Sequence, residues 1–193
     1  MITPEFRVGF PNLLEAKGSQ LYPDSVSYNL VMIFDESTDL TELEEMIEQA
    51  IQSKFPGGKG RPAYIPSPIR EGKPVSKSNP DGYDLGKYPQ YKDKFVIRAS
   101  RSVSQGAPGV VDAQLKPIID PKDIYSGMYG RARIEAYWNK NQKRVSLGLV
   151  NFQKTRDGER IGRATPKPED DFGVFVAPET DSKGGDNAEL LGV

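Results

Sequence analysis

The sequence predicts a mainly β protein: a small antiparallel barrel with one inserted helix and long loops. Most of its regular segments alternate apolar and polar residues with the period of a β-strand. Only one segment spaces its apolar residues as an α-helix does. The 19 glycines and 16 prolines among 193 residues indicate many turns and argue against a helical bundle.

Two strands are expected at the start of the chain. Residues 3–10 form the first extended segment, in which Phe6, Val8 and Phe10 occupy alternate positions. Residues 26–34, VSYNLVMIF, are the clearest strand, because they are rich in β-branched and aromatic residues and contain no breaker. The second half of this strand is apolar enough to be buried on both faces.

One helix is expected next, over residues 40–54. Its apolar stripe consists of Leu43, Met46, Ile47, Ala50 and Ile51. Either Asp39 or Thr41 can cap its start, since each precedes a glutamate by three residues. Lys54 at its end suits the helix dipole, and Pro56-Gly57-Gly58 stops it.

Residues 54–90 form a long segment that is broken by prolines and interleaves cations with tyrosines. A loop of this length is usually functional or disordered. Its aromatic content leads us to expect order, either on the domain or on binding. Two strands follow, over residues 94–100 and 110–115, and Pro117 ends the second.

A β-hairpin over residues 126–154 is the stretch around which the chain is organised. Its outgoing arm places four apolar residues on one face: Ala132, Ile134, Ala136 and Trp138. The opposite face of that arm carries Arg131, Arg133, Glu135 and Tyr137. The return arm has Val145, Leu147, Leu149 and Asn151 opposite Ser146, Gly148, Val150 and Phe152. A hairpin with cations and rings outside suits a small nucleic-acid-binding barrel; the alternative is an ordinary amphipathic hairpin with a solvated basic face.

About six strands, one helix and long loops suit an OB-type barrel, with a jelly roll or a sandwich as the alternative. Glycine inside the return arm, at Gly148, marks a bend or a place where a ligand comes close. From Ala164 the composition shifts to Pro, Asp, Glu, Gly and Ser. We therefore predict a domain at residues 1–165 and a flexible acidic tail at residues 166–193.

The composition excludes several kinds of site. The chain has no cysteine and no histidine, which removes disulfides, thiolate chemistry, Cys/His zinc sites and the commonest general base. We expect no cofactor and no metal. No apolar run approaches membrane-spanning length and no signal pattern opens the chain, so we expect a soluble, cytoplasmic protein.

The net charge of −1 conceals a strong segregation. Residues 1–53 hold two basic and ten acidic side chains, net −8. Residues 54–167 hold 23 basic and 10 acidic, net +13, and residues 168–193 hold one basic and seven acidic, net −6. The basic middle predicts a polyanion partner; the alternative is that the acidic N-terminal segment folds against it and neutralises it.

Polynucleotide binding needs cations for phosphates and exposed rings for bases, and the middle of the chain offers both. The phosphate candidates are Lys54, Lys59, Arg61, Arg98, Arg101, Arg131, Arg133, Lys140, Lys143, Arg144, Lys154 and Arg156. The stacking candidates are Tyr64, Tyr88, Tyr91, Tyr129, Tyr137, Trp138 and Phe152. Tyr137 is well placed because it alternates with Arg131 and Arg133, whereas Trp138 is equally a candidate for the core.

A metal-dependent nuclease is the rival function. It needs converging carboxylates, for which the candidates are Asp112, Asp120, Asp123 and Glu135. Their spacing is irregular and forms no motif, and the chain contains neither a P-loop nor GxGxxG. We therefore expect binding without catalysis.

The stretch VSLGLVNFQKTRDGERIG at residues 145–162, preceded by IYSGMYGRARIEAY at residues 124–137, resembles a phage family of single-stranded DNA-binding proteins. That family was first catalogued as a domain of unknown function. The resemblance covers nearly the whole chain, and RDGE is its most specific part. It implies an OB fold and non-sequence-specific coating of single strands during phage DNA replication or recombination in the host cytoplasm. The alternatives are a nuclease or other DNA-processing enzyme of the replication module, or a structural phage protein.

The acidic tail is similar to the partner-docking tails of single-stranded DNA-binding proteins generally. We expect it to reach phage replication proteins through Asp170, Asp171, Phe172, Phe175, Leu190 and Leu191. Such tails often end on an aromatic residue, whereas this one ends Leu190-Leu191-Gly192-Val193. The two leucines are our candidates for the role of the missing ring.

Overall fold

The computed structural model of the chain describes residues 1–18, 25–77, 79 and 82–162. Residues 1–162 form one compact unit. The predicted boundary between domain and tail, and all of the predicted tail residues, lie outside the described residues, so that division stays a prediction. Within the described ranges no helix is long and apolar enough to cross a membrane.

The described residues contain seven strands and one α-helix, so the prediction of a mainly β protein with one helix is confirmed. The strands are β1 (Phe6–Lys17), β2 (Ser27–Asp35), β3 (Ile69–Glu71), β4 (Lys94–Ser102), β5 (Gly109–Val111), β6 (Tyr129–Asn139) and β7 (Arg144–Arg156). Helix α1 (Thr41–Lys54) is inserted between β2 and β3.

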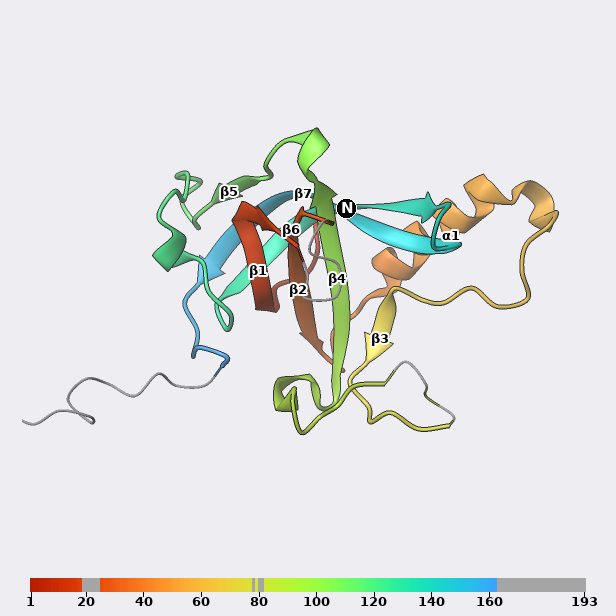
Figure 1. Ribbon diagram of the computed structural model, residues 1–193, viewed down its shortest axis with the longest axis horizontal. Coiled ribbons are helices and arrows are strands. Elements are labelled where there is room, and N and C mark those ends of the chain that lie inside the picture. Colours follow the sequence, from red (N-terminus) through yellow and green to blue (C-terminus); the bar gives the residue numbers. More distant parts are fainter. Residues whose placement is uncertain (19–24, 78, 80–81, 163–193) are drawn as a thin grey trace, which may run out of the picture. The chain divides into compact units, whose positions relative to one another are not determined.

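Five of the strands close into a ring (Figure 1). β1 pairs antiparallel with β2 and β6, β2 pairs with β4, and β6 pairs with β7. Parallel pairing of β4 with β7 completes the ring, with Ala99 opposite Leu147 and Ser100 opposite Gly148. The short strands β3 and β5 pair with β4 and β7. A closed ring of five strands is the arrangement that an OB-type barrel requires.

The core fills this ring and continues onto the helix. Phe6 and Phe34 pack edge to face with their ring centroids 5.4 Å apart. The same cluster includes Leu43, Ile47 and Ile51 of α1, all buried, which confirms the centre of the predicted apolar stripe. Helix α1 lies beside the hairpin end of β6 and β7 (Figure 1).

The start of the helix differs slightly from the prediction. Leu40 occupies the N-cap position and no side chain caps the helix there. The Asp39 carboxylate instead accepts a hydrogen bond from the Thr41 backbone N–H at 3.0 Å. Hydrogen bonding to Thr41 lowers the pKa of Asp39, since it favours the charged form.

Strand β1 is longer and less regular than the sequence predicts. It runs on through Pro11 to Lys17, with a shift in its pairing to β2 between Gly9 and Asn12. At this irregularity Phe10 adopts a φ of 45° and its side chain is 47% exposed. Phe10 therefore leaves the buried row of Phe6 and Val8 that the alternation suggested.

A second irregularity corrects the predicted orientation of Phe152. Arg133 pairs with Asn151 but Ile134 pairs with Leu149, so Val150 is an extra residue in β7. Beyond such a bulge the inward and outward positions exchange. Phe152 is consequently only 1% exposed, with its ring centroid 6.3 Å from that of Phe6, and does not lie on the polar side of β7 as predicted.

The long segment before β4 covers part of the outside of the barrel. Tyr91 is buried against Ile33 of β2 and Val96 of β4, and Tyr83 and Tyr88 pack around it. Tyr88 stacks on Tyr91 with ring centroids 5.4 Å apart. Burial raises the pKa of Tyr91, because the phenolate would lose its hydration. The end of this segment is thus ordered on the domain through its tyrosines, whereas Tyr64 near its start is exposed.

Phe152→Ala should lower the free energy of unfolding by about 3–5 kcal/mol, because it removes a buried ring and leaves a cavity. Urea denaturation followed by circular dichroism measures this change. Phe152→Leu, which keeps most of the apolar volume, should cost clearly less. An unchanged denaturation midpoint for Phe152→Ala would mean that the ring does not lie in the core.

Candidate nucleic-acid interface

Three neighbouring strands present an open strip on the outside of the barrel, which we call the outer face. It consists of outward-pointing residues of β4, β7 and β6: Arg98, Ser100, Ser146, Gly148, Glu135 and Tyr137. The residues that alternate with them on β4 and β7 are buried in the core: Ile97, Ala99, Val145, Leu147 and Leu149. OB-type barrels bind oligonucleotides across the second and third strands of the ring and beside the loop between the fourth and fifth. Here those parts are β2, β4 and the β6–β7 turn.

Tyr137 provides an open ring on this face. A side-chain carbon at position 148 would lie 3.6 Å from Cε1 of Tyr137, so the ring lies over the bare backbone of Gly148. The side chain of Tyr137 is nevertheless 46% exposed. A ring that the sheet supports from beneath and that stays accessible is what a nucleobase needs for stacking.

Several candidate cations are exposed and form no ion pair within the described ranges. They are Lys54, Lys59, Arg98, Arg131, Arg133, Lys140, Lys143 and Arg144. Arg98 lies on the outer face, two residues before Ser100. Arg131 and Arg144 donate hydrogen bonds to the neutral side-chain amides of Gln153 and Gln142. These side chains are available to phosphate groups.

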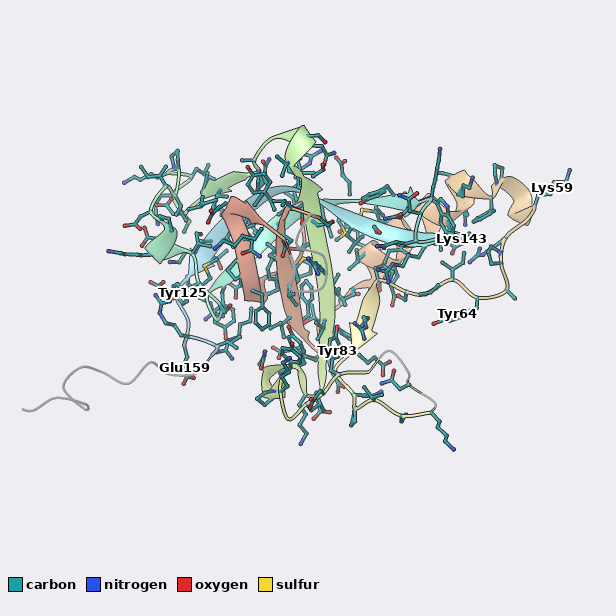
Figure 2. The ribbon with its side chains drawn as sticks, in the orientation of Figure 1. Lys59, Tyr64, Tyr83, Tyr125, Lys143 and Glu159 are labelled. Carbon is teal, nitrogen blue, oxygen red and sulfur yellow. The ribbon has the colours of Figure 1, made fainter. Side chains whose placement is uncertain are left out.

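The tip of the β6–β7 hairpin lies next to the C-terminal end of α1. Trp138 and Phe55 pack edge to face with ring centroids 5.0 Å apart, which joins the two segments. We call this region the basic end, because it gathers Lys54, Lys59, Lys140 and Lys143. Figure 2 shows Lys59, Tyr64 and Lys143 on this side, away from Tyr125 and Glu159. Trp138 is half-buried in this contact, so it serves packing here.

Other predicted phosphate ligands are occupied by the protein itself. Arg61 forms two hydrogen bonds with the Glu48 carboxylate, at 2.7 and 3.0 Å, and this interaction lowers the pKa of Glu48. Arg101 donates to three backbone carbonyl oxygens, those of Gln105, Gly106 and Leu149. It therefore ties the loop after β4 to β7 and is not free for DNA.

The alternative, that the acidic N-terminal segment folds against the basic middle and neutralises its charge, holds for three ion pairs. Arg61 pairs with Glu48, Arg156 with Glu5 and Lys94 with Asp35. Each pair joins residues 1–53 to residues 54–167. None of them involves the cations of the outer face or the basic end.

The remaining predicted rings are dispersed. Tyr64 is 72% exposed in the loop after α1. Tyr129 is half-buried beneath the Arg156 guanidinium, which lies 3.4 Å from the ring centroid. Tyr88 and Tyr91 belong to the cover over β2 and β4, and Phe152 belongs to the core. Of the predicted rings, Tyr137 is the one on the outer face.

The RDGE motif at residues 156–159 has a structural role. Asp157 accepts a hydrogen bond from the Tyr125 hydroxyl at 2.7 Å and pairs with Lys154 at 2.8 Å. These two interactions lower the pKa of Asp157. The Glu159 carbonyl accepts a hydrogen bond from Arg7, and Gly158 lies against the carbonyl of Gly127. The motif thus fastens the end of β7 onto the segment before β6.

Two of the four candidate nuclease carboxylates, Asp112 and Asp120, hold turns. Asp112 accepts hydrogen bonds from the backbone N–H groups of Gln114 and Lys116, and Asp120 from that of Lys122. Across the described residues, no group of three or more acidic, His or Cys side chains is placed to hold a metal ion.

Sequence reasoning missed Phe10, whose exposed ring was expected to follow the alternation of Phe6 and Val8. The signal that pointed to it is Pro11, which is unusual inside a strand and marks a bulge or an edge. The predicted tail residues, from Asp170 to Leu191, lie outside the described residues and stay candidates for partner docking.

A family model described as "Enterobacter phage Enc34, ssDNA-binding protein" matches residues 1–184. Among solved structures, the single-stranded DNA-binding protein of bacteriophage Enc34 in complex with ssDNA is 21% identical, with a TM-score of 0.60 over 83% of this chain and 88% of that one. The single-stranded DNA-binding protein gp2.5 of bacteriophage T7 is 12% identical, with a TM-score of 0.53 over 92% and 98% of the two chains. None of the curated protein sequences gives a significant match.

Gly158→Ala should destabilise the domain, because the added carbon would lie 2.3 Å from the carbonyl oxygen of Gly127. We expect a loss of about 1–3 kcal/mol in the free energy of unfolding, the usual cost of overpacking. Gly148→Ala is the matched control, since its added carbon makes ordinary contacts at 3.6 Å and beyond. Equal urea midpoints for the two variants would contradict the structural role of the motif.

Proposed function

Because the chain belongs to the Enterobacter phage Enc34 single-stranded DNA-binding protein family, we propose that it binds single-stranded DNA across the outer face and the basic end. In this proposal it coats strands exposed during phage DNA replication or recombination inside the host cell. The observation that supports the location is the open Tyr137 ring over Gly148, on the same face as Arg98, a cation that forms no ion pair with any residue that the structure describes.

The proposed mechanism is electrostatic capture followed by stacking. The exposed cations of the outer face and the basic end attract the phosphate backbone and release its counterions. A base then stacks on Tyr137, whose ring the sheet holds in place. Every base has a flat face, so this contact tolerates any sequence. Paired bases in a duplex are stacked on their neighbours, which favours single strands at this ring.

The proposal assigns no chemical step to the protein. The carboxylates that a nuclease would use hold turns at Asp112 and Asp120. Glu135 lies on the outer face beside Tyr137, where its charge opposes phosphate and so limits the affinity. Binding without catalysis is therefore the function that these side chains support.

Tyr137→Ala should weaken binding to single-stranded oligonucleotides by roughly 1–3 kcal/mol, the worth of one stacked base. The exposed position predicts little change in thermal stability. Tyr137→Phe keeps the ring and should bind like the unaltered protein. Fluorescence anisotropy with a labelled oligothymidine measures all three affinities. Normal binding by a folded Tyr137→Ala would place the interface elsewhere.

Arg98→Gln should reduce the slope of log affinity against log salt concentration by about 0.7, the value of one phosphate contact on a single strand. Arg61→Gln is the matched control. It also removes one positive charge, but from a guanidinium that Glu48 already holds. Titrations at several salt concentrations compare the two variants. Equal slopes for Arg98→Gln and the unaltered protein would remove Arg98 from the phosphate path.

A further inference from the structure

Phe10 is an exposed ring on a strained backbone. Its φ of 45° lies in the left-handed region, which a phenylalanine rarely adopts. The Phe10 backbone N–H donates to the Ser126 hydroxyl oxygen at 2.9 Å, which fixes the bulge in this conformation. The result is that a large apolar side chain is turned outward and left 47% exposed. Strain that exposes an apolar ring points to a role in binding.

A shallow pocket of about 330 Å³ lies beside this ring. It is lined by Phe10, Pro11 and Asn12 of β1 and by Ile124, Tyr125 and Ser126 of the segment before β6. Its walls therefore combine flat and apolar surfaces with an amide and a hydroxyl group. The Arg160 guanidinium stacks on Tyr125, 4.1 Å from the ring centroid, and forms no ion pair within the described part of the chain.

Strands β2 and β4, which Tyr83, Tyr88 and Tyr91 partly cover, lie between this pocket and the outer face. Phe10 packs edge to face on Tyr88, with ring centroids 6.0 Å apart, and Tyr88 and Val31 of β2 both pack against the buried cluster of Ile33, Tyr91 and Val96. Val31 pairs with Gly9 on one side and with Arg98 on the other. Gly9, beside Phe10, therefore lies in one row across the sheet with Val31 and Arg98, and the outer face continues from Arg98 to Gly148 and Tyr137; we call this row the path.

We propose that Phe10 and the pocket beside it bind one nucleobase of the DNA strand, at the end of the path opposite Tyr137. This inference rests on the proposed function. The base stacks on the exposed Phe10 ring, its polar edge meets Asn12 and Ser126, and Arg160 lies near enough to the pocket to attract the adjoining phosphate.

The spacing of the two rings suits a single bound strand. Phe10 is held beside Ser126, just before β6, whereas Tyr137 lies near the far end of that strand. At about 3.3 Å per residue, the stretch from Tyr129 to Tyr137 alone spans roughly 26 Å. An OB-type barrel occupies about 4–16 nucleotides of single-stranded DNA. Two stacking positions at this separation are compatible with one oligonucleotide that spans the barrel.

The test compares three variants of the full-length chain. Phe10→Ala removes the ring and Phe10→Trp restores a larger one. Leu115→Ala is the matched control, because Leu115 is also exposed, at 69%, and also has a positive φ, of 64°. Affinities are measured with labelled oligothymidines of about 4 to 16 nucleotides, the range of single-barrel sites. Thermal unfolding is measured in parallel.

Phe10→Ala should weaken binding of the longer oligonucleotides by roughly 5- to 150-fold, the loss of one stacked base. Phe10→Trp should bind like the unaltered chain, and so should Leu115→Ala. If Phe10→Ala binds every length normally while Tyr137→Ala does not, the inference fails and the proposed function stands. If the unaltered chain binds no single strand at all, the proposed function itself fails.

Photocrosslinking gives an answer that does not depend on any variant. A 5-iododeoxyuridine placed at one end of the oligonucleotide should crosslink to the peptide that contains Phe10. The same base at the other end should crosslink to the peptide that contains Tyr137. Crosslinks that never reach residues 9–12 or 124–126 from either end would overturn the inference.

Discussion

The outer face depends on one short contact, the parallel pairing of β4 with β7. Only two residue pairs make it, Ala99 with Leu147 and Ser100 with Gly148. Without it the ring would be an open sheet, and Arg98 would lie at the far edge from Tyr137. With it, β4 and β7 become neighbours, and Arg98 of β4 shares the outer face with Tyr137 of β6, which pairs with the other side of β7. The pairing that closes the barrel therefore also brings the residues of the outer face together.

The sequence predicted the elements well and the irregularities badly. The helical stripe and both arms of the hairpin follow from periods of 3.6 and 2, which local spacing reveals. A bulge adds one residue without changing the composition, so the alternation before Val150 could not show that Phe152 returns to the core. Phe10 was misplaced for the same reason. Both errors concern which face a ring occupies, and this decides whether it can meet a base.

The site was only partly predictable because charge pairing is not local. Arg156 and Glu5 are 151 positions apart, and only the folded chain brings them together. Arg61, Arg101 and Lys154 look like phosphate ligands in the sequence and are held by the protein in the structure. Arg98 and Lys143 have no such partner within the described residues, and nothing in their neighbouring sequence distinguishes them. Tyr137 was predictable, because the alternation along its strand places it on the polar face. Gly148, which has no side chain, also indicates an uncovered position on the neighbouring strand.

The small seam between β4 and β7 also makes the barrel responsive to its ligand. Its two residue pairs resist opening less than the eleven pairs between β6 and β7, and the pairing of β1 with β6 is equally short, so local unfolding should begin at these two seams. A strand that lies across Ser100 and Gly148 binds the closed ring and has no matching surface on an open one. By mass action it therefore shifts the opening equilibrium toward closure. In the proposed complex, bound DNA would stabilise the closed ring, and the free protein would exchange the amide hydrogens of this seam faster than the DNA-bound protein.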